Sequence, residues 1–124
     1  MSRTLIVGAG GLVGSLCRYW MAGVVQQLTG FEFPLGTLAV NVLGSFVIGL
    51  VFTLSLERGL LDANARLLLT TGFCGGFTTM STFSFETVAL LRDGSAVAAF
   101  GNIAGTLILC LAAVWLGDVT ARML

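Results

Sequence analysis

The sequence predicts an all-α integral membrane protein whose four transmembrane helices form a single domain over residues 1–124. Hydrophobic residues make up 56% of the chain and charged residues only 10%. Soluble domains carry about 25% charged residues, so this composition could not keep a folded surface in water. A formal net charge of zero also leaves no basic surface for nucleic acid. The chain is therefore expected to fold in a lipid bilayer.

Four apolar stretches have the length of membrane spans. A helix needs about 20 apolar residues to cross the hydrocarbon core. The stretches are residues 5–25, 36–56, 67–85 and 95–117. The first is interrupted only by Arg18, the third ends at Glu86, and the other two carry no charge. The remaining charges lie in the connections and at the ends, so we expect no separate soluble module.

The third stretch is expected to contain a break near residues 75–79. Gly75 and Gly76 lie at mid-membrane depth, where paired glycines weaken a helix. Five hydroxyl residues follow between positions 78 and 84, and each can bond the backbone in place of the helix ladder. Irregular backbone at this depth is tolerated where it is buried or lines a polar cavity, and its freed groups can hold ions. The alternative is a hydroxyl-rich helix face bonded to a neighbouring helix.

A few other polar residues lie inside apolar spans. Asn41 needs a partner or a ligand, because an unpaired buried amide is costly. Asn102, Thr106 and Cys110 recur every four residues on one face of the fourth span, which suits either an ion path or hydrogen bonds between helices. Glu86 is a candidate functional acid if it lies within the membrane, or an interfacial carboxylate if it lies in water.

Arginine and glycine positions bear on topology and packing. With four spans, Arg3, Arg58, Arg66 and Arg122 lie on one side, and Arg18 and Arg92 belong to the other. This bias is weak under the positive-inside rule, so the chain could insert in both orientations and form an antiparallel pair. Two glycine pairs at four-residue spacing, Gly10 with Gly14 and Gly101 with Gly105, favour close helix packing.

Three motifs together resemble the Fluc (CrcB) family of fluoride channels. They are GFCGGFTTMSTFSFE at residues 72–86, GTLAVNVLG at 36–44 and GLVGSLCRY at 11–19. The resemblance covers essentially the whole chain, in matching order and spacing. It implies an antiparallel, dual-topology homodimer with two pores. Such a dimer would pass fluoride passively out of the cytoplasm through the bacterial inner membrane.

The resemblance also assigns roles to individual residues. Asn41 and Phe83 match pore-lining positions, and Ser81 and Thr82 match hydroxyls beside the ion path. The polar residues on one face of the fourth span, Asn102, Thr106 and Cys110, fall where the family has a polar track. Glu86 and Met80 complete the set. The predicted pore residues are Asn41, Met80, Ser81, Thr82, Phe83, Glu86, Asn102, Thr106 and Cys110.

Two further assignments rest on the resemblance alone. The backbone carbonyls of Gly75 and Thr78 match positions that hold a structural Na⁺ at the dimer interface. Arg18 matches a position near the aqueous vestibule. One position departs from the family, since Met80 stands where the family pattern has phenylalanine.

The residue types suit a small, strongly hydrated anion. Hydroxyls and the Asn41 amide can donate hydrogen bonds in place of water, and a phenylalanine ring offers an electropositive edge. The main rival is a small dual-topology multidrug/proton antiporter, but that class needs an acid in its first span and none occurs between positions 1 and 31. A non-transporting assembly subunit would leave the polar break unexplained. An enzyme is not expected, since the chain has no histidine and no nucleophile–base pair.

Overall fold

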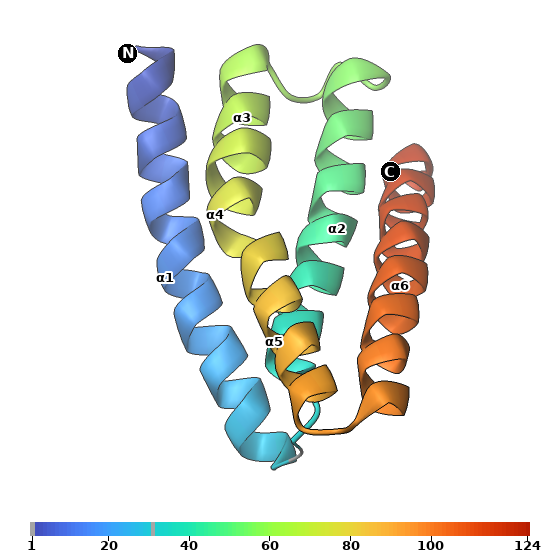
Figure 1. Ribbon diagram of the computed structural model, residues 1–124. Coiled ribbons are helices and arrows are strands. Elements are labelled where there is room, and N and C mark those ends of the chain that lie inside the picture. Colours follow the sequence, from blue (N-terminus) through green and yellow to red (C-terminus); the bar gives the residue numbers. More distant parts are fainter. Residues whose placement is uncertain (1, 31) are drawn as a thin grey trace.

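The computed structural model describes residues 2–30 and 32–124, and Figure 1 shows them as a bundle of helices. Three helices are long: α1 (Arg3–Thr29), α2 (Leu35–Leu56) and α6 (Ala96–Met123). The chain between α2 and α6 forms α3 (Ala63–Leu67), the π-helical segment η1 (Leu68–Cys74), α4 (Gly75–Phe77) and α5 (Met80–Arg92). Both termini lie toward the same end of the bundle (Figure 1), as an even number of crossings requires.

Within the described residues, α1, α2 and α6 are long and apolar enough to cross a membrane. They correspond to the first, second and fourth expected spans. α1 extends beyond the expected bounds at both ends, and α6 extends beyond them at its C-terminal end. The third expected span, residues 67–85, falls on the run of short helices from α3 to α5. That run ends at Arg92, so Glu86 lies inside α5 and does not close the segment.

The connection after α1 is fixed by local hydrogen bonds. Gly30 ends the helix in the left-handed conformation at φ 63°, and its N–H donates to the Gln26 carbonyl, which is the usual role of glycine at a helix end. The Gln26 side chain then accepts from the Gly36 N–H at 3.0 Å and donates to the Phe33 carbonyl at 3.1 Å. One side chain thus joins the end of α1 to the start of α2.

Glycines let α1 lie directly against η1 and α4. A Cβ on Gly14 would stand 3.0 Å from the Phe77 nitrogen and would also meet the Phe73 carbonyl. A Cβ on Gly10 would lie 2.8 Å from the Phe73 nitrogen. The expected packing role of this glycine pair is confirmed. By contrast, Gly101 and Gly105 have open space around them within the chain.

A second close contact joins α2 and α6, which run side by side in Figure 1. A Cβ on Gly49 would meet the backbone of Val114, and a Cβ on Gly117 would lie 2.8 Å from the Leu50 nitrogen. Backbones that approach this closely gain dispersion contacts, which is how membrane helices associate without a hydrophobic drive.

Polar groups join the same two helices at the end where the termini lie. The Thr53 hydroxyl donates to Asp118 at 2.6 Å, and Arg122 pairs with Glu57 at 2.5 Å. The Arg58 guanidinium donates to the carbonyl of Arg122 at 2.8 Å, so it caps carbonyls that the end of α6 leaves without helical donors.

Candidate functional site

The chain leaves helical geometry between α4 and α5. The last helical hydrogen bond of α4 runs from the Thr78 N–H to the Cys74 carbonyl at 2.9 Å. Thr78 (φ −90°, ψ 159°) and Thr79 (φ −151°, ψ 118°) are extended, and α5 begins at Met80. The two extended threonines lie within the expected region of residues 75–79.

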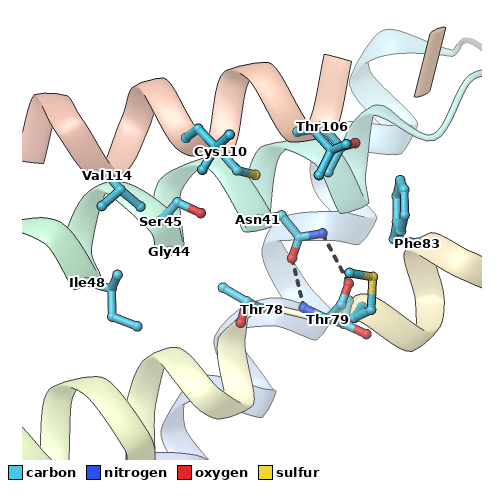
Figure 2. Close-up of a pocket in the computed structure, with 13 residues that line it drawn as sticks. Asn41, Gly44, Ser45, Ile48, Thr78, Thr79, Phe83, Thr106, Cys110 and Val114 are labelled. Carbon is cyan, nitrogen blue, oxygen red and sulfur yellow. Dashed lines mark hydrogen bonds between the residues drawn. The ribbon is translucent and has the colours of Figure 1, made fainter. Parts of the chain in front are cut away.

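Asn41 of α2 holds the backbone of Thr79. Its side-chain oxygen accepts from the Thr79 N–H at 2.8 Å, and its Nδ2 donates to the Thr79 carbonyl at 3.1 Å. Figure 2 shows both bonds as dashed lines. An unbroken helix would instead direct the Thr79 N–H to the Gly75 carbonyl, so Asn41 removes the donor that Gly75 would otherwise receive.

The Thr79 side chain removes the helical donor of a second carbonyl, that of Thr78. Its hydroxyl oxygen accepts from the Thr82 N–H at 3.1 Å, which makes Thr79 the N-cap of α5. In an unbroken helix that N–H would bond to the Thr78 carbonyl. Within the described residues, neither the Gly75 nor the Thr78 carbonyl oxygen accepts a hydrogen bond.

The carbonyl of Gly76, unlike those of Gly75 and Thr78, accepts a hydrogen bond from a side chain. It accepts from Nε of Arg18, on α1, at 3.0 Å. In an unbroken helix the donor would be the Met80 N–H. The interruption therefore leaves Gly75 and Thr78 with open carbonyls, while the Gly76 carbonyl is satisfied by a cationic side chain.

A groove of about 350 Å³ runs beside the interruption, between α2, α5 and α6 (Figure 2). Its lining is mostly apolar, with amide, hydroxyl and thiol groups placed along it. The lining residues are Asn41, Gly44, Ser45, Ile48, Thr78, Thr79, Met80, Phe83, Thr106, Leu107, Cys110, Leu111 and Val114. Residues from three separate parts of the sequence thus meet at one surface.

The predicted site residues divide between this groove and its surroundings. Those that line it are Asn41, Thr78, Met80, Phe83, Thr106 and Cys110. Those outside its lining are Arg18, Gly75, Ser81, Thr82, Glu86 and Asn102. Gly75 and Ser81 are exposed on the single chain, and Met80 is 70% exposed although it borders the groove.

The polar stripe on α6 makes hydrogen bonds to α5 at one end. Asn102 is buried, and its Nδ2 donates to the Thr87 hydroxyl at 2.9 Å. Thr106 donates to the Asn102 side-chain oxygen at 3.4 Å, which is long for such a bond. Thr106 and Cys110 border the groove, whereas Asn102 joins two helices.

The Glu86 carboxylate accepts a hydrogen bond from the Thr37 hydroxyl of α2. Thr37 and Asn41 stand one helical turn apart, so α2 contacts both α5 and the interruption with a single face. Glu86 is half-buried in this arrangement, and its carboxylate is linked to the same α2 face that holds Thr79.

Sequence reasoning did not assign roles to three threonines that the structure places at the site. Thr79 supplies the backbone groups that Asn41 binds, Thr37 meets Glu86, and Thr87 meets Asn102. Four-residue spacing offered a signal for two of them. Thr37 precedes Asn41 by one turn and Thr87 follows Phe83 by one turn. Thr79 carried no spacing signal of its own.

The open carbonyls fit a hard cation. Na⁺ is bound through oxygen atoms, as hard cations prefer, and two carbonyls from each of two chains would supply four. Within the described residues, no three His, Cys, Asp or Glu side chains gather to hold a metal ion, so backbone oxygens are the donors on offer. On the other side of the break, the free amides at the start of α5 favour negative charge.

Comparison with known proteins places the chain in a family. Residues 5–118 match the family model described as CrcB-like protein, Camphor Resistance (CrcB). A protein of Geobacter sp. (strain M21) is 44% identical, with 100% of both chains covered. One of Opitutus terrae is 50% identical over 98% of this chain and 93% of its own, and one of Geobacter sulfurreducens is 48% identical over 100% of both. Each is named a fluoride-specific ion channel, FluC, which is not an enzymatic function. As the three motifs predicted, the chain belongs to the CrcB family.

Proposed function

We propose that this chain is the subunit of a fluoride-selective ion channel, which passes fluoride passively across the membrane and lowers its concentration in the cytoplasm. The observation that carries the proposal is the groove beside the interruption, where polar donors line a surface between α5 and the two apolar spans α2 and α6. The names of the full-length relatives support the same ion.

The groove offers a small anion several weak contacts. The Thr106 hydroxyl, the Cys110 thiol and the second N–H of the Asn41 amide can donate hydrogen bonds there. Phe83 borders the same groove and can offer a ring edge. Conduction needs sites that replace water without holding the ion strongly. Among the residues that the structure describes, no charged side chain lines this groove, which suits rapid release.

The remaining predicted pore residues extend this path in the proposal. Ser81 and Thr82 lie on the first turn of α5, next to Met80, and their hydroxyls lie within hydrogen-bond distance of the Thr79 hydroxyl, which borders the groove. Asn102 continues the α6 track beyond Thr106, and Glu86 lies with Thr37 near one end of the path. Arg18 belongs to the vestibule side of the interruption.

The proposal includes a dimer. Residues 1–124 form one four-helix domain whose third crossing, α3 to α5, is broken at Thr78 and Thr79. Two such domains pair in antiparallel orientation in the bacterial inner membrane and enclose two pores. Support comes from the open side of the groove, from the exposure of Met80, and from the space around Gly101 and Gly105. A single chain of this size leaves the polar groove uncovered.

A structural Na⁺ at the dimer interface is part of the same proposal. Its ligands are the carbonyl oxygens of Gly75 and Thr78 from both chains. Support comes from the loss of both helical donors and from the exposure of Gly75 on the single chain. The bound cation neutralises two helix C-terminal ends that would otherwise face each other.

The central test is anion efflux from liposomes that contain the purified protein. Fluoride should leave the liposomes rapidly once a potassium ionophore balances charge, and chloride should be retained. A multidrug/proton antiporter would instead move a cationic dye against a proton gradient and pass no fluoride. Protein-free liposomes and liposomes loaded with chloride serve as controls.

A further inference from the structure

The interior of α1 carries one charge, and that charge bonds to the backbone of a distant helix. Arg18 is half-buried, and its Nε donates to the Gly76 carbonyl, 58 residues along the chain. A cation within a membrane helix is costly unless it has a partner or a function. The carbonyl that it meets is one of those released by the interruption.

We infer that Arg18 is a positioning residue, which fixes the interrupted segment by taking the place of the missing Met80 N–H on the Gly76 carbonyl. This inference rests on the proposed channel function and deepens it. It assigns Arg18 a backbone partner, in addition to its place on the vestibule side. The effect on fluoride is indirect, since Arg18 does not line the groove.

The surroundings of Gly76 explain why this carbonyl is the one that is held. A Cβ on Gly76 would lie 2.9 Å from the Ser15 hydroxyl oxygen and 3.1 Å from the Ser15 nitrogen. Gly76 therefore packs directly on α1, one turn before Arg18. The glycine brings the two backbones together, and the arginine then reaches the carbonyl from the same helix.

The chemistry of the bond suits the end of a helix. The helical run that begins at Ala63 ends at Phe77, and its last carbonyls form the negative end of the helix dipole. A guanidinium hydrogen bond is charge-assisted and is stronger than a bond between neutral groups. Arg18 thus stabilises a helix end that stops within the membrane.

Asn41 and Arg18 hold two residues that are three positions apart, and they do so from two different helices. Asn41, on α2, holds Thr79, while Arg18, on α1, holds Gly76. Both replace bonds that the uninterrupted helix would make for itself. The carbonyls of Gly75 and Thr78 are left open between and beside these two anchors, so the anchors determine where they point.

The test is hydrogen–deuterium exchange of the full-length protein in detergent, read by mass spectrometry on peptides covering residues 72–83. We compare wild type with Arg18→Lys, Arg18→Gln and Arg18→Leu. Arg92→Leu is the matched control, because it removes an arginine from the same predicted side of the membrane. Arg92 lies in the last turn of α5 and, among the described residues, makes no hydrogen bond to the interruption. Fluoride efflux is measured on the same proteins at low and high ionic strength.

Exchange of the Thr78 and Thr79 amides should be fastest in Arg18→Leu, intermediate in Arg18→Gln and slowest in wild type. The increase in Arg18→Leu should be about tenfold or more, as expected for loss of a hydrogen bond to a charged group. Arg18→Lys should restore part of the protection, and Arg92→Leu should match wild type. Fluoride efflux should fall in the same order at both ionic strengths.

Wild-type protection in both Arg18→Leu and Arg18→Gln would overturn the inference. So would a loss of efflux that appears only at low ionic strength, since that is the signature of a charge that attracts anions from solution. If Arg18→Leu does not fold, Arg18→Gln carries the same comparison. Failure of the wild-type protein to pass fluoride would overturn the channel proposal, while the exchange order would still decide the role of Arg18.

Discussion

The side-chain amide of Asn41 makes two hydrogen bonds to the backbone of a single residue, Thr79, which is 38 positions away. The amide presents its oxygen to the Thr79 N–H and its nitrogen to the Thr79 carbonyl, as a neighbouring β-strand would. This pairing satisfies polar groups that would be costly without partners in the membrane. It also means that Asn41 both shapes the interruption and borders the groove.

Asn41→Asp should lower fluoride efflux by about tenfold or more. The carboxylate keeps an acceptor for the Thr79 N–H, but it places a second oxygen against the Thr79 carbonyl, 3.1 Å from the present nitrogen. An unpaired carbonyl and a negative charge beside an anion path both oppose conduction. The measurement is liposome efflux.

Asn64→Asp is the matched control for that substitution. Asn64 is exposed in the first turn of α3, where a negative charge is favourable. Fluoride efflux through the Asn64→Asp variant should equal that of wild type. If Asn41→Asp also conducted at the wild-type rate, the amide would be only a packing group and the role given to it would be wrong.

Gly14→Ala should destabilise the protein, whereas Gly8→Ala should not. A methyl group on Gly14 meets the Phe73 carbonyl and the Phe77 nitrogen, which are backbone atoms that cannot rotate away. Overpacking of this kind costs about 1–3 kcal/mol. Gly8 lies on the same helix with nothing within 4 Å, so alanine there adds up to about 1 kcal/mol of helix propensity. Thermal unfolding midpoints in detergent should separate the two, and equal midpoints would contradict the packing described for α1.

Met80→Phe should leave the fold intact and keep or raise fluoride efflux. Methionine and phenylalanine fill similar volumes, and Met80 is 70% exposed at the groove, so a ring can be accommodated. The ring adds an electropositive edge next to that of Phe83. Paired efflux measurements on both forms provide the test.

Phe85→Met makes the reverse exchange on the same helix. Phe85 is 71% exposed and does not line the groove, so its replacement should leave efflux unchanged. A sharp loss of efflux in Met80→Phe would show that ring edges at position 80 take no part in conduction. The hydroxyl and amide groups of the groove would then have to act without them.

The weak arginine bias predicts insertion in both orientations. A single cysteine introduced as Ser2→Cys, with the three native cysteines replaced, should react with an impermeant thiol reagent from both sides of intact membranes. About half should react from outside, and the rest only after permeabilisation. Labelling from one side alone would contradict dual topology.

Much of the helical layout could be predicted from the sequence, because hydropathy and membrane thickness constrain it strongly. The expected span 36–56 differs by one residue from α2, which begins at Leu35. The extended residues Thr78 and Thr79 fall where paired glycines and hydroxyls were expected to weaken the helix. These features depend on local sequence alone.

The partners of the site residues could not be predicted in this way. The bonds of Asn41 to Thr79 and of Arg18 to Gly76 join residues 38 and 58 positions apart. They depend on how helices are packed, and sequence spacing on one helix says nothing about a neighbour. The π-helical segment was missed for a related reason, because no residue type marks the wider turn.

The π-helical segment η1 has a consequence for length changes in this part of the chain. A π-turn holds more residues than an α-turn, so Leu68–Cys74 contains slack relative to an ordinary helix. Losing one residue there can be absorbed by rewinding to α-geometry, which keeps later side chains near their present orientation about the axis. Thr79 would still face Asn41, and Gly76 would still face Arg18. A one-residue deletion within Leu68–Cys74 should therefore be tolerated far better than a one-residue deletion in the ordinary α-helical turns of α5, which would rotate every later side chain.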